Sequence, residues 1–279
     1  MTTLQAILDR QPRADFDVGF GETDIAGFEE RGFIQVERVT TEAELDWLRE
    51  LYDYLFSHKL ATIPGGYFDL VREYDADGED LLPQILAPEQ QFPQLRTTAF
   101  WRNGQRLAAQ LLRQKREDMK GWGHMIRKPA RIGEALPWHQ DEAYWDPTMS
   151  YLAVGCWMPL DPATVESGCM SFVPGSHRGA ILPHKHVGDD PNVHGLYAVP
   201  DPADVARAVA APCPPGGAVM HHPRMLHCSG PNVSDHVRRA YANEWQLTPV
   251  KREVADVRPW HTEGKQAFAQ RRQFEKSGS

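Results

Sequence analysis

Two side chains that bind metal ions well lie two positions apart near the middle of the chain, in the segment PWHQD. On an extended strand, His139 and Asp141 would project from the same face, because successive side chains alternate between faces. One short segment could therefore offer an imidazole nitrogen and a carboxylate oxygen to a single ion. The same spacing is common in surface pairs and turns, so it predicts a metal site only together with a third ligand.

The third ligand is expected from a distant part of the chain. Among the 12 histidines, the best candidate is His227 in MLHCSGPN, which follows a strand-like segment. Two histidines and one carboxylate form the facial triad of non-haem Fe(II) oxygenases, which leaves coordination positions open for a bidentate co-substrate and O2. We therefore expect His139, Asp141 and His227 to be the metal ligands and the catalytic residues.

A 2-oxo acid that chelates iron also needs a cation near its distant carboxylate. Arginine suits this role because its planar guanidinium forms two charge-assisted hydrogen bonds with a carboxylate. Arg238 and Arg239 are adjacent in VSDHVRRAYANEW. On a strand, only one of them can face the interior.

Aromatic and acidic residues flank the first two candidate ligands. Trp138, Tyr144 and Trp145 are candidate substrate contacts, although most aromatic side chains in a β-protein belong to the core. Glu142 is a candidate for a hydrogen-bond partner that orients a ligand.

The strand-like segment that precedes PWHQD contains further candidates. Arg127 and Lys128 could contact an anion, but Lys128 is expected to face solvent. Met125, or its neighbour His124, is a candidate for lining the co-substrate pocket. His177 follows a Pro-Gly-Ser turn and is expected to pack locally rather than bind a metal.

Helices are predicted mainly in the first 120 residues. The segment 41–56 starts with the capping-box residues Thr41 and Glu44 and has leucines at helical spacing. Shorter helices are expected at 25–31 and 104–116, and the segment 32–39 alternates like a strand.

After residue 120, short runs rich in β-branched and aromatic residues alternate with turn residues, a pattern typical of an antiparallel sandwich or barrel. The predicted strands lie in WGHMIRK, YLAVGCWMPL, CMSFVP, GGAVMHH and RAYANEWQL. Residues 184–215 are expected to be a long irregular loop of the kind that covers a substrate, with a short helix at 203–210.

Composition limits the class of protein. The chain has 279 residues, of which 41% are hydrophobic and 24% are charged, which is typical of a soluble globular protein and long enough for one large domain. We expect one domain over 1–279, with supporting helices mainly in 20–120 and a barrel core in about 121–250.

Charge and targeting signals suggest which partners the protein has. A net charge of −8 without a basic run argues against a nucleic-acid partner, and no apolar stretch predicts a membrane span. The N-terminal residues lack a secretory pattern, so a cytoplasmic location is expected. The four cysteines show no CxxC pair and are expected to be buried thiols.

Several motifs together resemble one family. His139-Gln140-Asp141, His227 and an arginine eleven residues after His227 occur in the order found in phytanoyl-CoA dioxygenases, which are Fe(II)/2-oxoglutarate-dependent oxygenases. The segments ESGCMSFVPGSH and HCSGPNVSDHVRR are similar to two further elements of that family. The resemblance covers roughly residues 20–250.

This resemblance implies a fold and a set of roles. The fold would be the double-stranded β-helix, a cupin-like jelly-roll barrel with N-terminal helices outside. Fe(II) would be bound by His139, Asp141 and His227, and 2-oxoglutarate by Arg238, with Ser229 and Trp157 lining its pocket. Because Asp141 is present where halogenases of the family have alanine or glycine, hydroxylation of a small-molecule C–H bond is favoured over chlorination.

Two other classes of function use parts of the same pattern. A zinc hydrolase could use the same three ligands with an activated water, but this leaves Arg238 unexplained and requires a general base, for which Glu142 is the candidate. A non-catalytic barrel that binds a small molecule would not need the ligands at all. The motifs do not reveal the substrate or the oligomeric state.

Overall fold

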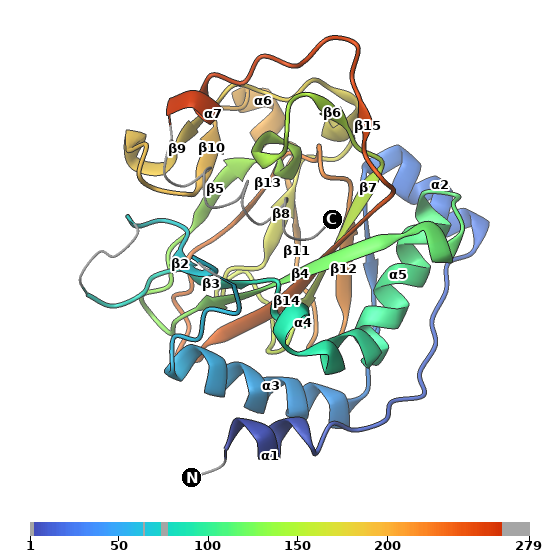
Figure 1. Cartoon of the computed structure of the whole chain (residues 1–279). Helices are drawn as coiled ribbons and strands as arrows, with labels where there is room; N and C mark the ends of the chain where they lie inside the picture. The colour runs from blue at the N-terminus through green and yellow to red at the C-terminus, as the bar shows by residue number, and fades with distance from the viewer. Residues whose placement is uncertain (1–2, 64, 74–77, 264–279) are drawn as a thin grey trace.

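The structure is a computed structural model that describes residues 3–63, 65–73 and 78–263. Two antiparallel β-sheets face each other, and helices cover the other side of the larger sheet (Figure 1). The chain is therefore mainly β with additional helices, in agreement with the fold class predicted from the strand pattern.

The larger sheet has seven strands, and each pairs with its neighbours in the antiparallel sense. In spatial order they are β1 (Phe33–Val36), β12 (Ala218–His221), β7 (Ala153–Pro159), β14 (Arg238–Gln246), β4 (Lys120–Lys128), β3 (Pro83–Leu86) and β2 (Tyr67–Asp69). Strands β4, β7, β12 and β14 include residues from four of the predicted strand segments.

The smaller sheet has four strands in the order β11 (Val209–Ala211), β8 (Met170–Phe172), β13 (His227–Ser229) and β5 (Leu136–His139). Its inner face packs against the larger sheet through a shared apolar cluster. In this cluster the ring of Phe33 on β1 stacks on that of Phe172 on β8, with centroids 4.6 Å apart. Polar side chains that lie between the two sheets would therefore be shielded from water.

Four helices bury apolar residues in the cluster that they share with the larger sheet: α1 (Leu4–Leu8), α2 (Glu22–Arg31), α3 (Glu42–Ser57) and α5 (Ala99–Leu111). The other helices are short: α4 (Pro88–Gln91), α6 (Pro202–Val205) and α7 (Trp260–Glu263). The predicted helix at 41–56 is confirmed as α3, and those at 25–31 and 104–116 overlap α2 and α5. Each leucine that α3 buries fully contributes about 1.5–3 kcal/mol.

The start of α3 differs from the predicted capping box in one detail. The Thr41 side chain accepts a hydrogen bond from the Glu44 backbone N–H, as predicted. The Glu44 carboxylate instead accepts hydrogen bonds from the backbone N–H groups of Ala99 and Phe100 at the start of α5. Glu44 is fully buried, so it ties two helices together rather than capping its own.

The segment 184–215 is not an irregular loop. It contains the hairpin of β9 (His184–His186) and β10 (Leu196–Ala198), followed by α6 and β11. Tertiary pairing overrides the turn-rich composition here, because β11 completes the edge of the smaller sheet beside β8. The predicted helix at 203–210 is limited to Pro202–Val205.

Short elements complete the description. Strands β6 (Met149–Ser150) and β15 (Val250–Lys251) form a two-stranded pair. The 3-10 helices are η1 (Pro93–Thr97), η2 (Arg116–Asp118), η3 (Asp141–Tyr144), η4 (Ser176–Arg178) and η5 (Val187–Asp189). Within the described ranges, no helix combines the length and apolar character needed to cross a bilayer.

Candidate metal centre

The three predicted ligands lie together at the ends of two neighbouring strands. His139, the last residue of β5, is paired in register with His227, the first residue of β13. Asp141 begins η3, and its Oδ1 lies 3.6 Å from Nε2 of each histidine. These side chains form the one group of described His, Cys, Asp or Glu residues whose ligand atoms all lie within 4.8 Å of one another.

Backbone contacts fix the tautomers of the two histidines. Nδ1 of His139 lies 2.8 Å from the carbonyl oxygen of Pro137, and Nδ1 of His227 lies 2.9 Å from that of Met225. A carbonyl oxygen only accepts hydrogen bonds, so each Nδ1 carries the hydrogen and each Nε2 keeps its lone pair. Both lone pairs are therefore available to an ion beside Asp141, and the donor set fits a divalent metal.

The surroundings of the three candidate ligands favour the ionisation states that bind metals. It lowers the pKa of His139 and lowers that of His227 to about 3. Burial opposes ionisation of Asp141, but interaction with His227 and a hydrogen bond from His221 hold its pKa below the usual range. At neutral pH the group thus consists of two neutral imidazoles and one carboxylate.

A cationic site lies in the same interior, on the larger sheet. Arg238 is 2% exposed, and its Nε and Nη1 are buried without a hydrogen-bond partner. Its guanidinium lies over the ring of Trp157, 5.3 Å from the centroid. Burial lowers the pKa of Arg238 to about 10, which leaves it charged at neutral pH. An unpartnered buried guanidinium fits a carboxylate ligand.

Lys128 reinforces this positive charge. It lies directly across the strand pair from Arg238 and is fully buried, contrary to the prediction that it faces solvent. Its Nζ donates hydrogen bonds to the Ser229 hydroxyl, at 2.9 Å, and to the carbonyl oxygens of Ser229 and Gly230. Burial and the charge of Arg238 hold the pKa of Lys128 well below its usual value. An anion bound nearby would favour the charged form of Lys128 and so oppose both the effect of burial and the repulsion by Arg238.

Arg239 faces the opposite way, as expected for the neighbour of an inward-facing arginine. Its guanidinium makes two hydrogen bonds with Asp161, at 2.9 and 2.7 Å, and a third with Asp53. Arg239 therefore already has carboxylate partners, and Arg238 does not.

Met125 does not fit its predicted place in the co-substrate pocket. Side chains alternate along β4, so Met125 lies on the opposite face from Lys128. It is fully buried in the cluster formed with the helices. Its neighbour His124 has the same orientation as Lys128 and contacts Gln84, with Nδ1 3.2 Å from Oε1.

The three flanking aromatic residues occupy different environments. Tyr144 lies edge-on to His139, with ring centroids 6.2 Å apart, and its hydroxyl accepts a hydrogen bond from the Leu196 backbone N–H. Trp138 follows the alternation of β5 away from His139 and packs beside Leu226. Trp145 packs in a separate apolar cluster. Of the three, Tyr144 is the one in ring contact with a candidate ligand.

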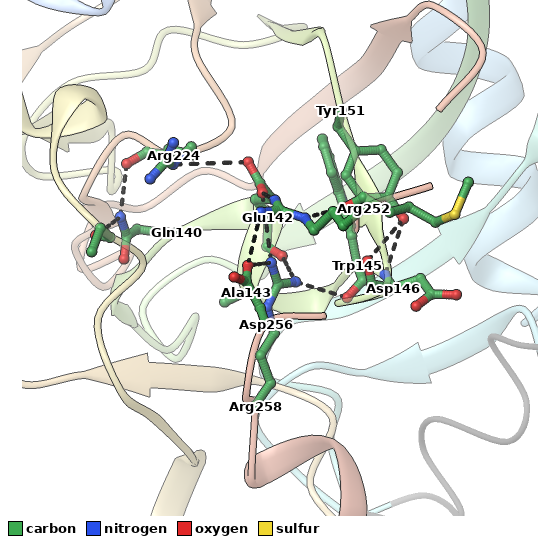
Figure 2. Close-up of polar contacts among 12 residues, drawn as sticks. Gln140, Glu142, Ala143, Trp145, Asp146, Tyr151, Arg224, Arg252, Asp256 and Arg258 are labelled. Atoms are coloured by element: carbon green, nitrogen blue, oxygen red, sulfur yellow. Dashed lines mark hydrogen bonds and ion pairs between the residues drawn. The ribbon is translucent and has the colours of Figure 1, made fainter. Parts of the chain in front are cut away.

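Glu142 is held by arginines rather than aimed at the metal ligands. It is 2% exposed, and Figure 2 shows Arg252 and Arg258 pointing at its carboxylate. Oε1 lies 3.0 Å from Arg252 Nη2 and 3.5 Å from Arg258 Nη2, and Oε2 lies 4.0 Å from Arg224 Nε. Glu142 therefore anchors the C-terminal segment onto η3, the element that begins with Asp141.

Two other histidines lie outside the predicted ligand set. His177 is not in the metal-binding group, as predicted, but its contact is with a distant helix: its Nε2 lies 3.3 Å from the carbonyl oxygen of Glu29 on α2. His221 was not singled out by its sequence pattern, yet its Nε2 lies 2.8 Å from Oδ2 of Asp141. Nothing in the spacing of the MHH segment marks it, because the contact joins β12 to η3, which lies 80 positions earlier in the chain.

Two histidines and one carboxylate set between antiparallel sheets are characteristic of one class of protein, the non-haem metal proteins with a facial three-residue site. The chain belongs to the phytanoyl-CoA dioxygenase (PhyH) family, which matches residues 28–240.

Curated relatives match about two fifths of the chain. A probable phytanoyl-CoA dioxygenase of Caenorhabditis elegans is 30% identical over 128 residues, which are 43% of this chain and 41% of that protein. A probable alpha-ketoglutarate-dependent hypophosphite dioxygenase of Stutzerimonas stutzeri is 32% identical over 124 residues, which are 41% of this chain and 43% of that protein. The matched part thus spans less than half of either relative.

A solved structure matches over a much larger share. EvdO2 from Micromonospora carbonacea var. aurantiaca is 39% identical, with a TM-score of 0.76 over 88% of this chain and 99% of that chain. A second structure of EvdO2, in complex with 2-oxoglutarate, gives 37% identity and a TM-score of 0.75. This chain is therefore similar in fold to a protein that binds 2-oxoglutarate.

Proposed function

We propose that the protein is an Fe(II)- and 2-oxoglutarate-dependent oxygenase that oxidises a C–H bond of a small molecule, with hydroxylation as the outcome. The observation that carries this proposal is the unpartnered, buried guanidinium of Arg238 in the same interior as the group of His139, Asp141 and His227. The facial ligand group supports a metal, and Arg238 supports a co-substrate carboxylate.

Each residue has a role that follows from its contacts. His139, Asp141 and His227 would hold Fe(II) through Nε2, a carboxylate oxygen and Nε2. Arg238 would bind the distant carboxylate of 2-oxoglutarate, and Trp157 supports its guanidinium. When bound, Fe(II) and 2-oxoglutarate supply the O2-dependent oxidation chemistry that yields succinate and CO2.

Ser229 completes the carboxylate site. Its hydroxyl oxygen already accepts a hydrogen bond from Lys128 Nζ, so its own hydrogen is free to be donated to another acceptor. With Arg238 and Lys128 nearby, that acceptor would be the co-substrate carboxylate. Tyr144 is the aromatic residue best placed to contact a substrate, because its ring borders His139.

The alternative functions have less support. A zinc hydrolase needs a general base near the metal, but both carboxylate oxygens of Glu142 face arginines. A barrel without catalytic activity would not need two metal-ready histidine tautomers beside a carboxylate. The hydrolase alternative also leaves the buried charge of Arg238 unexplained.

The proposal also covers the domain organisation, the fold, the partners and the location of the protein. We propose that residues 1–279 form one domain and that the two sheets form the double-stranded β-helix that the family resemblance implies. A small-molecule substrate fits the family to which the chain belongs. The absence of a nucleic-acid or membrane partner and a cytoplasmic location remain predictions from the sequence.

An anaerobic binding experiment tests the function. Fe(II) and 2-oxoglutarate are added to metal-free protein, and the visible spectrum is recorded for the wild type, Asp141→Ala and Arg238→Ala. We expect a weak metal-to-ligand charge-transfer band in the wild type, an altered band in Asp141→Ala, and a band in Arg238→Ala that needs far more 2-oxoglutarate. Arg239→Ala is the matched control and should need no more 2-oxoglutarate than the wild type.

The result also directs the next step. If the band appears in the wild type and changes in the variants as expected, candidate substrates can be screened by measuring the release of succinate. No band in folded, iron-loaded wild-type protein would contradict the proposal and favour zinc titration with hydrolase assays.

A further inference from the structure

Asp141 has two carboxylate oxygens, and their surroundings differ. Oδ1 lies 3.6 Å from Nε2 of both His139 and His227. Oδ2 lies 2.8 Å from Nε2 of His221, which projects from β12 in the larger sheet. One oxygen thus faces the ligand group, and the other contacts a third imidazole from the opposite sheet.

The ring nitrogen that carries the hydrogen differs between His221 and the two candidate ligands, His139 and His227. In His139 and His227 the hydrogen is on Nδ1, where a backbone carbonyl accepts it. An ionised carboxylate only accepts, so Nε2 of His221 must carry a hydrogen and donate it to Asp141. Nδ1 of His221 is buried without a hydrogen-bond partner, so Nε2 is the ring nitrogen whose hydrogen has an acceptor. His221 is therefore a donor toward Asp141, and its Nε2 has no lone pair for a metal.

A glycine on the neighbouring strand of the larger sheet leaves room for the His221 imidazole. His221 is 5% exposed and lies in register with Gly155 on β7. A Cβ atom at Gly155 would lie 2.6 Å from Cε1 and 2.8 Å from Nε2 of His221, closer than real contacts allow. The ring of Phe172, whose centroid is 5.6 Å away, limits movement toward the smaller sheet.

We propose that His221 is a positioning residue for the metal centre, which holds Oδ2 of Asp141 by a hydrogen bond so that the carboxylate binds the metal through Oδ1 alone. This inference rests on the proposed function. A carboxylate bound through one oxygen occupies one coordination position, which keeps the remaining positions open for a bidentate co-substrate and O2. Outer partners of this kind orient ligands and raise metal affinity.

The test compares variants that differ in hydrogen-bond donation at position 221. His221→Phe keeps an aromatic ring but removes the donor, and His221→Gln places an amide N–H near the position of Nε2. Metal-free proteins are titrated with Co(II), and the dissociation constant is read from the visible absorption of the bound ion. We expect His221→Phe to weaken Co(II) binding roughly 10- to 100-fold and His221→Gln to recover most of the affinity.

Two further variants test whether the position of the His221 imidazole, and not only its presence, is required for metal binding. Gly155→Ala retains the imidazole but displaces it, so it should also weaken Co(II) binding. His222→Phe changes the adjacent histidine, which packs against His177 and does not contact the ligands, so it should bind Co(II) like the wild type. Circular dichroism of each metal-free variant establishes that it is folded.

The outcomes distinguish this inference from the proposed function, because Co(II) binding requires neither 2-oxoglutarate nor turnover. Wild-type affinity in His221→Phe, or equal losses in the Phe and Gln variants, would overturn the positioning role. Pulsed EPR of Cu(II)-loaded wild type should show two coordinated imidazoles, and a third that disappears in His221→Phe would make His221 a ligand instead. If the wild type binds no divalent metal, both the inference and the proposed function fail.

Discussion

Two buried basic side chains lie directly across a strand pair from each other, Lys128 on β4 and Arg238 on β14. Burial and repulsion by Arg238 hold the pKa of Lys128 well below its usual value. The Lys128 amino group has three oxygen acceptors, whereas two nitrogens of Arg238 have no hydrogen-bond partner. The pair therefore fits an anionic ligand, such as the dicarboxylate proposed above.

Replacement of Lys128 by methionine tests this interpretation at the scale of one residue. Lys128→Met removes the amino group that holds the Ser229 hydroxyl, so the dissociation constant for 2-oxoglutarate should rise about tenfold, as expected for loss of one well-placed hydrogen bond of about 1.4 kcal/mol. The measurement is a calorimetric titration of the protein loaded with metal under anaerobic conditions.

A control on the same strand is available. Lys120 is exposed at the other end of β4, so Lys120→Met should bind 2-oxoglutarate like the wild type. If Lys128 acts through Ser229, the effects of Lys128→Met and Ser229→Ala should not add in the double variant. Unchanged affinity in Lys128→Met would show that Arg238 suffices alone.

At the scale of elements, η3 is a short segment that depends on the C-terminal region for its position. Arg258 Nη1 donates to the carbonyl oxygens of Glu142 and Trp145 (Figure 2). The Trp260 indole donates to the carbonyl oxygen of Ala143. These contacts fix the backbone of the turn that begins with the candidate ligand Asp141. Residues more than a hundred positions later in the sequence thus help to position the candidate metal centre.

Removal of Arg258 should loosen this element. Its side chain is 1% exposed, and Arg258→Met would leave the buried Glu142 carboxylate and two carbonyl oxygens with fewer partners. We expect the free energy of unfolding to fall by about 3–5 kcal/mol, which is typical when one partner of a buried ion pair is removed. Urea denaturation followed by circular dichroism measures this change.

The neighbouring arginine provides the comparison. Arg252 contacts the same carboxylate but is 26% exposed, so Arg252→Met should destabilise the protein less. Equal effects of the two variants, or no effect of Arg258→Met, would contradict the view that Arg258 is the main support of η3.

At the scale of the whole molecule, buried neutral histidines predict how stability depends on pH. Burial lowers the pKa of His184 to about 4 and that of His222 to about 3. Each ring also accepts a hydrogen bond from a backbone N–H, which a protonated nitrogen could not do. In the unfolded chain both residues titrate near pH 6.5.

The sign of the effect follows from proton binding. Between about pH 6.5 and pH 3 the unfolded chain binds more protons than the folded protein, so the free energy of unfolding should fall as the pH falls through this window. Each unit of pKa difference corresponds to about 1.4 kcal/mol per histidine. Urea denaturation at a series of pH values checks this. His184→Gln, which keeps an acceptor but cannot be protonated, should show a shallower loss, and a stability that does not vary with pH would contradict the prediction.

The sequence by itself determined the features that depend on local geometry. Alternation along an extended segment predicted that His139 and Asp141 lie together, although β5 ends at His139 and Asp141 begins η3 after the extended residue Gln140. A threonine cap with helical leucine spacing predicted α3 to within one residue at each end. Short apolar runs between turn residues predicted five strands of the two sheets. These patterns follow from backbone periodicity and need no information about distant residues.

Tertiary structure decided which of the candidate side chains meet, and with which partners. The register of β14 against β4 buries Lys128 beside Arg238, and the facing of β12 toward β5 brings His221 to Asp141. Burial and partner choice depend on pairing between segments far apart in the chain, which composition and local spacing do not encode. For the same reason Met125 faces the helices, and part of the segment 184–215 is a hairpin, because the sheet that each strand joins sets the direction of its side chains.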